Sequence, residues 1–485
     1  MITSPADPPP RRPSLRRRLL RGVSWMLIGR VASMASLFAV NVLLARRMGD
    51  AELGAYLLAS FLVPFFAQLM SLGTTDIALR VVRRGHVTGD PDISRAMIRA
   101  CLILYVASGA VVSAVLVVLC RVLAEGRPAW QLLSESAHWF ALWMLLYTGS
   151  QLTSELFRGR DMFGLSTAMF SKSGGWLSNV LTLGAIAAAS LASDDLDLPL
   201  VLGLHVAMLA LAVLVGGALA YRDLWLRPGP APLEGSGDAA ASDIPSRPTL
   251  RWMLSQSWPI SVSAGTLLGI EQLDIFVVSL FASDLDVADF GFAKRCLVLI
   301  NFAFVTVSPA LMPFIAELFE RGELRKLERL VRGTATLVGL PCVALCVAVF
   351  AIAPWFATLV FGAEHAGVAL PLRILIAGQA FLFLAGHGQI VLLMTGQQRK
   401  LMVSTVVIGS VFALLCPLAT FWYGMAGAAV VKSLATAERS AAAALIVRKT
   451  LGIGTTASLS PAVIRDSIQL VLNTARPRRA TEASP

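Results

Sequence analysis

The stretch LPLVLGLHVAMLALAVLVGGALA at residues 198–220 carries no charged side chain, and stretches like it decide the fold. About 20 residues of α-helix, at about 1.5 Å per residue, cross the hydrocarbon core of a bilayer. Residues 198–220 are therefore predicted to form one transmembrane helix. Comparable apolar stretches predict about twelve such spans, at residues 23–45, 51–73, 97–120, 137–157, 165–190, 198–220, 254–282, 291–318, 333–356, 367–395, 400–421 and 425–447.

The composition of the whole chain supports a membrane protein. Of its 485 residues, 56% are hydrophobic and 15% are charged, and the mean hydropathy is +0.71. Roughly a quarter of the residues of a soluble globular chain are charged, so this chain cannot cover its surface with polar groups. Because lipid offers no hydrogen-bond partners, the backbone inside a bilayer must satisfy its own polar groups, as continuous helices do. The prediction is an all-α integral membrane protein, which excludes soluble, fibrous, disordered and disulfide-stapled secreted classes.

A polar segment divides the predicted spans into two equal sets. Residues 221–250 contain five prolines and three glycines, a composition typical of solvated linkers. The predicted organisation is a basic cytoplasmic tail (1–22), an N-terminal six-helix lobe (23–220), a cytoplasmic linker (221–250), a C-terminal six-helix lobe (251–450) and a cytoplasmic tail (451–485). Apolar residues at helical spacing in the last tail predict a short helix on the membrane surface, with a disordered tail as the alternative.

The two predicted lobes resemble each other weakly. Residues 50–56 and 286–292 both begin with an acidic turn and continue through a hydrophobic residue and a glycine into the next span. An even number of spans in each lobe brings both lobes into the membrane from the same side, which predicts a pseudo-two-fold axis along the membrane normal. Two such lobes are expected to enclose a central cavity and to give alternating access by rocking.

The distribution of charge predicts the orientation of the chain. Most of its 41 lysines and arginines fall in the two tails and in the even-numbered connections between spans. An excess of basic residues marks cytoplasmic segments, so both termini are predicted to be cytoplasmic. The net charge of +11 has this topological explanation and does not indicate nucleic-acid binding.

Several ionisable residues lie within predicted spans, where they are costly unless paired or hydrated and therefore indicate function. The residues singled out are Arg30, Glu155, Glu271, Asp274, Lys294, Arg295, Arg373 and Lys432. Glu271 and Asp274 are three residues apart and share a helix face. Two adjacent carboxylates disfavour joint ionisation, which makes this pair a candidate for ion coupling. The alternative is that a basic neighbour such as Arg30 neutralises them.

The other intramembrane charges also have structural interpretations. Lys294, Arg295 and Arg373 can reach the outer interface with their long side chains. Glu155 and Lys432 either line the cavity or form structural ion pairs. Arg30 lies well inside its span and is expected to face the cavity.

The sequence carries no recognisable metal, cofactor or catalytic motif. Its six cysteines show no Cys-x-x-Cys spacing, and no histidine or carboxylate accompanies the nearby pair Cys342 and Cys346. A phosphate-binding loop, a Gly-x-Ser-x-Gly elbow and a His-Glu-x-x-His motif are lacking from the sequence. The prediction is a transporter without a cofactor rather than an enzyme, driven by ion gradients, membrane potential or substrate supply.

Four segments resemble turns between helices in the polysaccharide flippases of the multidrug/oligosaccharidyl-lipid/polysaccharide exporter (MOP) superfamily. These are residues 43–56 (LLARRMGDAELGAY), 158–163 (RGRDMF), 393–399 (LMTGQQR) and 423–429 (YGMAGAA). The resemblance implies a flippase that moves undecaprenyl-diphosphate-linked oligosaccharide across a bacterial inner membrane, for lipopolysaccharide O-antigen, capsule or exopolysaccharide. It also implies contact with membrane lipids, and a polysaccharide polymerase and glycosyltransferases as functional partners. The related lipid II flippases have fourteen helices, two more than this chain is predicted to have.

A cationic cavity suits such a substrate. Moving one charge of the diphosphate through hydrocarbon has an idealised cost of about 20 kcal/mol, most of which a hydrated, positively charged cleft removes. In the family that the chain resembles, basic residues of the cavity are thought to hold the diphosphate, and Arg30 is the position that matches best. We expect Lys294, Arg295 and Arg373 to join Arg30 in binding it.

Two other functional classes stay open at the level of the sequence. One is an ion-coupled exporter of drugs or other small molecules, from the same superfamily or from the major facilitator group. The other is a membrane polymerase or ligase acting on lipid-linked sugars. Such enzymes usually carry a large extracytoplasmic loop, whereas the outer connections predicted here are all short.

Overall fold

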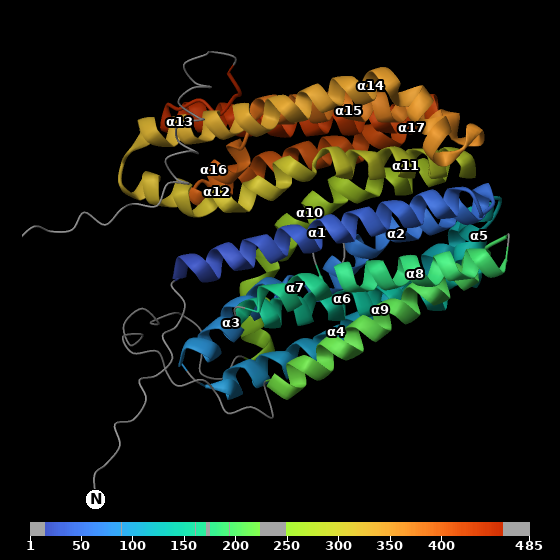
Figure 1. Cartoon of the computed structure of the whole chain (residues 1–485), viewed down its shortest axis with the longest axis horizontal. Helices are drawn as coiled ribbons and strands as arrows, with labels where there is room; N and C mark the ends of the chain where they lie inside the picture. Colours follow the sequence, from blue (N-terminus) through green and yellow to red (C-terminus); the bar gives the residue numbers. More distant parts are fainter. Residues whose placement is uncertain are drawn as a thin grey trace, which may run out of the picture.

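The computed structural model describes residues 15–88, 90–160, 162–170, 175–193, 195–223 and 249–458, and all regular structure in these segments is helical. Figure 1 shows the helices aligned along one elongated bundle. The first half of the chain forms α1 (Leu15–Ala45), α2 (Asp50–Ser71), α3 (Thr74–Thr88), α4 (Pro91–Leu123), α5 (Pro128–Glu135), α6 (Ala137–Gly159), α7 (Phe163–Met169), α8 (Trp176–Ala192) and α9 (Leu198–Tyr221). The second half forms α10 (Leu250–Phe281), α11 (Asp284–Ile300), α12 (Phe302–Glu320), α13 (Leu324–Thr334), η2 (Ala335–Gly339), α14 (Leu340–Phe361), η3 (Ala363–Val368), α15 (Ala369–Ala385), α16 (Gly388–Met394) and α17 (Gln398–Leu451).

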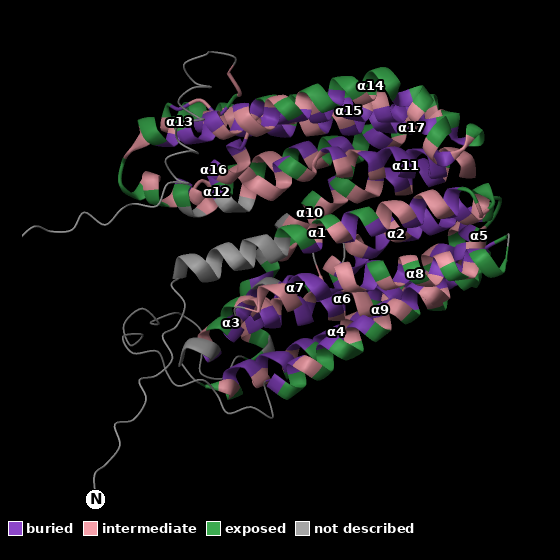
Figure 2. Ribbon diagram, in the orientation of Figure 1, coloured by how far each residue is buried: buried purple, intermediate pink, exposed green. Residues whose placement is uncertain are grey.

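The spans agree with an integral membrane protein. Eight of the described helices are long and apolar enough to cross a membrane, and the bent pair α11–α12 adds a ninth span if it is counted as one. The other predicted spans correspond to α6, to α7 followed by α8, and to the second arm of α17. Large apolar side chains such as Val106, Leu214 and Leu414 are at least 70% exposed on the outside of the bundle, as expected of a surface solvated by lipid. Figure 2 shows buried residues concentrated where the helices face one another.

Helix α17 is a hairpin of two arms. Gly424 has φ 55° and ψ −146°, a backbone conformation that residues with a Cβ rarely adopt. A Cβ on Gly427 would lie 2.0 Å from the carbonyl oxygen of Ala419, so the chain folds back on itself around Gly424. The two arms correspond to the predicted spans at 400–421 and 425–447.

The span predicted at residues 367–395 is interrupted. The chain breaks between α15 and α16 at Gly386, which has φ 78°. A Cβ at this position would lie 2.2 Å from the carbonyl oxygen of Thr455, because the segment after α17 packs into the break. The backbone N–H of Ala457 donates to the carbonyl of Leu384 at 2.8 Å, and so satisfies an acceptor that the interrupted helix leaves free.

Helix α11 begins earlier than the span predicted at its position. Ser283 caps the helix, and its hydroxyl and the carboxylate of Asp286 form a capping box. Lys294 and Arg295 therefore lie about three turns inside the helix instead of near its start. The interpretation that these two side chains reach the outer interface is wrong, since Lys294 is buried and Arg295 is half-buried inside the bundle.

Some predicted segments fall partly outside the described residues. Helix α1 already begins at Leu15, within the predicted basic tail. Helices α9 and α10 border the predicted linker, of which residues 224–248 are outside the described part. The span predicted at residues 165–190 corresponds to α7 and α8, separated by residues 171–174, which are not described. The surface helix predicted near the C-terminus lies beyond residue 458, where the description ends.

The two halves of the chain form two lobes. Figure 1 shows α1–α9, in blue to green, on one side and α11–α17, in yellow to red, on the other. Helix α10 packs against both α2 of the first lobe and α17 of the second. Hydrogen bonds join the lobes: the Arg46 guanidinium donates to the carbonyl of Leu359 at 3.0 Å, and the Trp130 indole N–H donates to the Ser279 hydroxyl at 3.1 Å.

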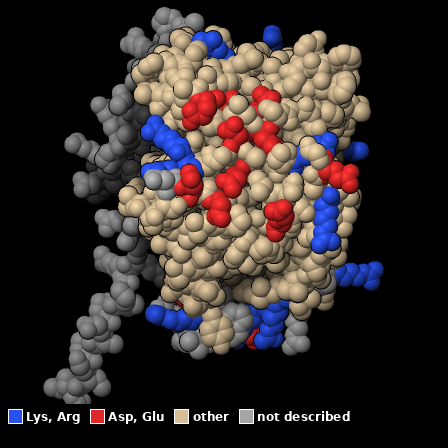
Figure 3. Space-filling view, turned by 90° about the vertical axis from the view of Figure 1, so that its right-hand side faces the viewer, with Lys and Arg blue, Asp and Glu red and all other residues tan. Residues whose placement is uncertain are grey.

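One end of the bundle is rich in carboxylates, and Figure 3 shows them gathered across this face. The turns before α2, α9 and α11 meet there, since the backbone N–H of Leu196 donates to the carbonyl of Arg47 at 3.0 Å, and Gly54 packs against the backbone of Asp284. The acidic end, as it is termed below, is defined by Asp50, Glu52, Asp195, Asp197, Asp284, Asp286 and Glu364. The opposite end is where α9 ends and α10 begins.

Candidate functional site

A cavity of about 130 Å³ lies inside the bundle, where helices of the first lobe face α10 and α11. Aromatic rings form much of its wall, and hydroxyl, amide, imidazole and guanidinium groups line the rest. This aromatic cavity is defined by Tyr56, Ser60, Phe61, Trp143, Tyr147, Phe170, Asn179, His205, Gln272 and Arg295.

Arg295 is the cation of the aromatic cavity. Its Nη2 donates to the Ser60 hydroxyl at 2.6 Å, and its guanidinium carbon lies 4.3 Å from the ring centroid of Phe61, a cation–π geometry. Pro64, also in the cavity wall, lacks the N–H that would bond to the carbonyl of Ser60 in a regular helix. The turn of α2 that carries Ser60 and Phe61, the two residues in contact with Arg295, therefore has one backbone hydrogen bond fewer than a regular helix.

Packed rings fix the shape of the cavity wall. Tyr56 of α2 stacks on Trp143 of α6, with ring centroids 6.0 Å apart and planes inclined by 23°. The Trp143 ring lies 4.2 Å from that of His205 on α9, and Tyr147 meets Phe170 edge-on at 5.1 Å. Three helices of the first lobe thus hold the rings in one rigid surface, as in pockets that bind organic ligands.

Several polar atoms of the cavity are unpartnered within the described part of the chain. They are the hydroxyl of Tyr56, Nδ1 of His205, Oε1 of Gln272 and Nε of Arg295, all shielded from solvent. Buried polar atoms in folded proteins nearly always have a hydrogen-bond partner. Unpartnered atoms that converge on one cavity indicate a place where a polar ligand or water supplies the missing bonds.

A cluster of charges lies beside the cavity. The Asp274 carboxylate on α10 is fully buried and accepts a hydrogen bond from Nζ of Lys294 on α11, which also donates to the carbonyl of Glu271 at 2.9 Å. Nζ of Lys432 on α17 lies 3.8 Å from the same carboxylate and donates to the carbonyl of Ile270 at 2.6 Å. We term Asp274, Lys294 and Lys432 the lysine–aspartate cluster.

One ring separates the cluster from the aromatic cavity. Nζ of Lys294 lies 4.4 Å from the centroid of Phe61, the ring that Arg295 also contacts. A further ion pair joins Arg439 of α17 to Glu271 at 3.4 Å. This region holds the four cations Lys294, Arg295, Lys432 and Arg439 against the two carboxylates of Glu271 and Asp274, an excess of two positive charges.

The structure brings together five of the residues singled out in the sequence: Glu271, Asp274, Lys294, Arg295 and Lys432. The alternative that basic neighbours neutralise the two carboxylates is confirmed, but Arg30 is not one of them: Lys294 and Lys432 pair with Asp274, and Arg439 pairs with Glu271. Lys432 forms an ion pair between helices, which was one of its two interpretations.

The other three predicted residues lie elsewhere. Arg30 is half-buried on α1, has no ion-pair partner within the described residues and does not line the aromatic cavity. The Nε of Arg373 donates to the carbonyl of Phe350 at 2.9 Å, and its guanidinium packs against that ring, which holds it on the α14–α15 face. Glu155 pairs with Arg158 one turn along the same helix. The predicted cluster of Arg30 and Arg373 with Lys294 and Arg295 is thus not assembled.

The aromatic and amide residues of the cavity were not among the site residues predicted from the sequence. Tyr56, Trp143, Tyr147, Asn179 and Gln272 each lie in a predicted span. Polar and aromatic residues within apolar spans are the signal that could have drawn attention to them. That signal does not tell which side of each helix faces the interior.

The fold is that of the MOP superfamily transporters. The chain superposes on an inward-facing multidrug resistance MATE family transporter of this superfamily with a TM-score of 0.66 and 17% identity, over 87% of this chain and 94% of the other. An outward-facing MATE family transporter gives a TM-score of 0.56 and 15% identity, over 91% and 97% of the two chains. The lipid II flippase MurJ in an inward closed conformation gives a TM-score of 0.58 and 14% identity, over 94% of this chain and 91% of the other.

The sequence itself defines the family. Residues 19–319 match the family described as polysaccharide biosynthesis protein, and the chain belongs to that family. No significant match was found among curated proteins. Family and fold together indicate a multi-pass membrane protein connected with polysaccharide biosynthesis, with the fold of the MOP superfamily transporters.

Proposed function

We propose that the protein is a flippase that moves undecaprenyl-diphosphate-linked oligosaccharide units from the cytoplasmic to the outer leaflet of a bacterial inner membrane. The observation that carries the proposal is the aromatic cavity, where rings, unpartnered polar atoms and the Arg295 guanidinium meet inside a membrane domain. Sugars need hydrogen-bond partners once they leave water, and their apolar faces pack well on aromatic rings. Glycosyltransferases would supply the substrate, and a polymerase would consume it for surface polysaccharide.

The charge of the region supports an anionic headgroup. The excess of two positive charges in the region of Lys294, Arg295, Lys432 and Arg439 complements a diphosphate. The planar guanidinium of Arg295 matches phosphate oxygens in a bidentate way. Arg295 is the cation that lines the cavity, and its Nε has no hydrogen-bond partner within the described residues. Arg295 is thus assigned to the diphosphate, with Lys294 behind it.

The arrangement of the lobes supports alternating access. The hydrogen bonds from Arg46 to Leu359 and from Trp130 to Ser279 close the bundle toward the acidic end. The chain also superposes better on the inward-facing MATE transporter, at a TM-score of 0.66, than on the outward-facing one, at 0.56. With the acidic end outside and both termini cytoplasmic, the two lobes (23–220 and 251–450) would rock to carry the headgroup outward.

Arg295→Met is the direct test, with Arg373→Met as the matched control in another span. Loss of a charged hydrogen bond of about 1.5–3 kcal/mol predicts that Arg295→Met lowers polysaccharide export by at least about tenfold. Export is measured in a strain whose own gene is deleted, at matched protein levels, together with the leaflet in which lipid-linked units accumulate. Accumulation in the cytoplasmic leaflet is expected for Arg295→Met, and normal export for Arg373→Met. Normal export by the Arg295 variant, or accumulation in the outer leaflet, would contradict the proposal.

A second candidate is an ion-coupled exporter of small molecules. Multidrug transporters share the fold, and the aromatic wall of the cavity also suits a small organic ligand. Drug accumulation in the deletion strain separates the two functions. Increased accumulation of cationic drugs with unchanged polysaccharide would favour the exporter.

A further inference from the structure

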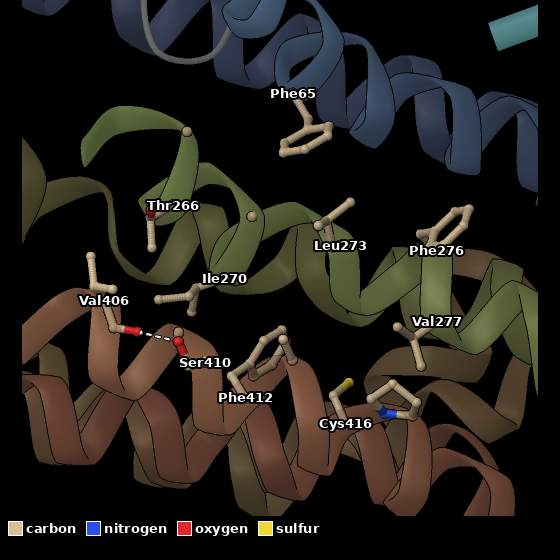
Figure 4. A pocket seen from close by; sticks show the side chains of 15 residues that line it. Phe65, Thr266, Ile270, Leu273, Phe276, Val277, Val406, Ser410, Phe412 and Cys416 are labelled. Carbon is tan, nitrogen blue, oxygen red and sulfur yellow. Dashed lines mark hydrogen bonds between the residues drawn. The ribbon is translucent and has the colours of Figure 1, made fainter. Parts of the chain in front are cut away.

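A second and larger hollow lies on the other side of α10. It has a volume of about 440 Å³ and runs between α10 and the first arm of α17, with Phe65 of α2 at its rim. Figure 4 shows the side chains of the two helices facing each other across it. This lateral groove is defined by Gly265, Gly269, Ile270, Leu273, Val406 and Phe412.

Two residues that line the lateral groove carry hydroxyl groups, and both hydroxyls are already hydrogen-bonded. The Thr266 hydroxyl donates to the carbonyl of Val262 at 2.8 Å, and the Ser410 hydroxyl donates to that of Val406 at 3.0 Å, the bond drawn in Figure 4. Each hydroxyl is thus satisfied within its own helix. The remaining wall consists mostly of aliphatic and phenyl groups, so the groove suits a hydrocarbon ligand.

Glycine keeps the floor of the groove open. A Cβ built on Gly265 would have no atom within 4 Å, so a side chain placed there would project into free space. Val406, at the edge of the groove, is 37% exposed on the surface that faces lipid. The groove therefore has free space at Gly265 and opens to the surface of the bundle at Val406.

A single helix separates the groove from the aromatic cavity. Ile270 and Leu273 of α10 line the groove, whereas Gln272 of the same helix lines the cavity. On α2, Phe65 lines the groove, and the preceding residue Pro64 lines the cavity. Helices α2 and α10 are in contact between the two hollows, since a Cβ on Gly269 would lie 4.0 Å from the ring of Phe65.

We propose that the lateral groove holds the polyprenyl chain of the substrate while its diphosphate–sugar headgroup occupies the aromatic cavity; this assignment rests on the proposed function. From Gly265 to Val277 the groove follows α10 for about 18 Å, more than half of the roughly 30 Å hydrocarbon core. The headgroup of a phospholipid stays at the membrane surface, and its acyl chains start there. A polyprenyl chain attached to a headgroup in the cavity instead starts beside the groove, at the depth of Ile270 and Gln272.

Photo-crosslinking of the full chain in nanodiscs tests this assignment. The probe is undecaprenyl diphosphate with diazirine groups on its chain, compared with phosphatidylethanolamine that carries a diazirine on an acyl chain. Saturable binding of the undecaprenyl probe is measured first, and crosslinked peptides are then mapped by mass spectrometry. We expect crosslinks of this probe in residues 265–277 and 406–417, removed by excess unlabelled undecaprenyl diphosphate and not by excess phosphatidylethanolamine.

Gly265→Trp fills the groove, and Gly217→Trp is the matched control on α9, where a Cβ also has no atom within 4 Å. The groove crosslinks should fall by at least about tenfold in Gly265→Trp and stay unchanged in Gly217→Trp. The wild-type crosslink map tests the assignment even if Gly265→Trp fails to fold.

Three outcomes would overturn the assignment. Saturable binding with crosslinks elsewhere would overturn the groove and leave the proposed function intact. Equal labelling of the groove by the phosphatidylethanolamine probe, without competition by undecaprenyl diphosphate, would identify a site for bulk acyl chains only. Failure of the undecaprenyl probe to bind at all would overturn the proposed function, and the groove assignment with it.

Discussion

Phe61 is the residue on which the candidate site is centred, because its ring centroid lies 4.4 Å from the Lys294 ammonium and 4.3 Å from the Arg295 guanidinium carbon. The two cations are adjacent in sequence and have different partners: Lys294 bonds to a carboxylate, whereas Arg295 bonds to a neutral hydroxyl. A cation bonded to a neutral group keeps its charge available for an anionic ligand. This difference is why the substrate role is assigned to Arg295 and a structural role to Lys294.

Asp274→Asn should destabilise the protein. The change leaves Lys294 and Lys432 buried without a carboxylate, and breaking a buried ion pair from one side costs about 3–5 kcal/mol. Thermal unfolding in detergent measures the effect. The control Glu317→Gln removes an exposed pair with Arg321 and should change stability by less than about 1 kcal/mol.

A double-mutant cycle separates pairing from packing. Asp274→Asn combined with Lys294→Met should cost less than the sum of the two single changes, since the second change removes one of the cations stranded by the first. Simple additivity would show that the lysine–aspartate cluster is not coupled.

At the scale of single elements, three interruptions set the geometry: the reversal in α17, the break between α15 and α16, and the 50° bend between α11 and α12. Each falls where a glycine adopts a positive φ or where one helix ends and the next begins. The reversal in α17 brings both arms of this helix to α10: Cys416 of the first arm lines the groove, and Lys432 of the second arm belongs to the lysine–aspartate cluster.

Gly424→Ala should destabilise the hairpin of α17. The conformation at φ 55° and ψ −146° is nearly restricted to glycine, and a Cβ there would meet no atom within 4 Å, so the cost is backbone strain of about 1–3 kcal/mol. The control is Gly217→Ala in the interior of α9, where alanine is favoured over glycine by up to about 1 kcal/mol. The melting temperature should fall for the first variant and hold or rise for the second. Equal melting temperatures would show that Gly424 is not strained in the folded protein.

At the scale of the whole molecule, transport by alternating access requires the lobes to separate at the acidic end. Helices α2 and α11 pack across the lobe boundary there, and a Cβ on Gly291 would lie 3.2 Å from that of Leu57. This separation is close to the roughly 3.8 Å found in disulfides.

A disulfide between Leu57→Cys and Gly291→Cys should lock the lobes. We expect oxidation to abolish polysaccharide export and reduction to restore it. The control pair Gly388→Cys and Ala443→Cys lies within one lobe, with Cβ atoms 3.4 Å apart, and should leave export unchanged when oxidised. Undiminished export by the locked interlobe pair would show that the lobes do not separate at this boundary.

Much of the architecture could be predicted from the sequence, and the site in part. The apolar runs predicted the membrane class and the course of most spans, and the rule that buried charges mark function picked out Asp274, Lys294 and Arg295. The same rule also selected Arg373, which bonds to the backbone of α14 away from the cavity. A charge within a span is visible in the sequence, but the direction in which its side chain points is not.

The sequence by itself determined that this chain lives in lipid, where its helices run, and which family it belongs to, because hydropathy and family motifs are properties of consecutive residues. The tertiary structure alone decided that Lys432 reaches the backbone of Ile270, 162 positions earlier in the chain, and that rings from α2, α6 and α9 enclose one cavity with Arg295. The physical reason is that the partners of a buried charge are set by how helices rotate and pack against one another. That packing depends on the fit of many distant side chains at once.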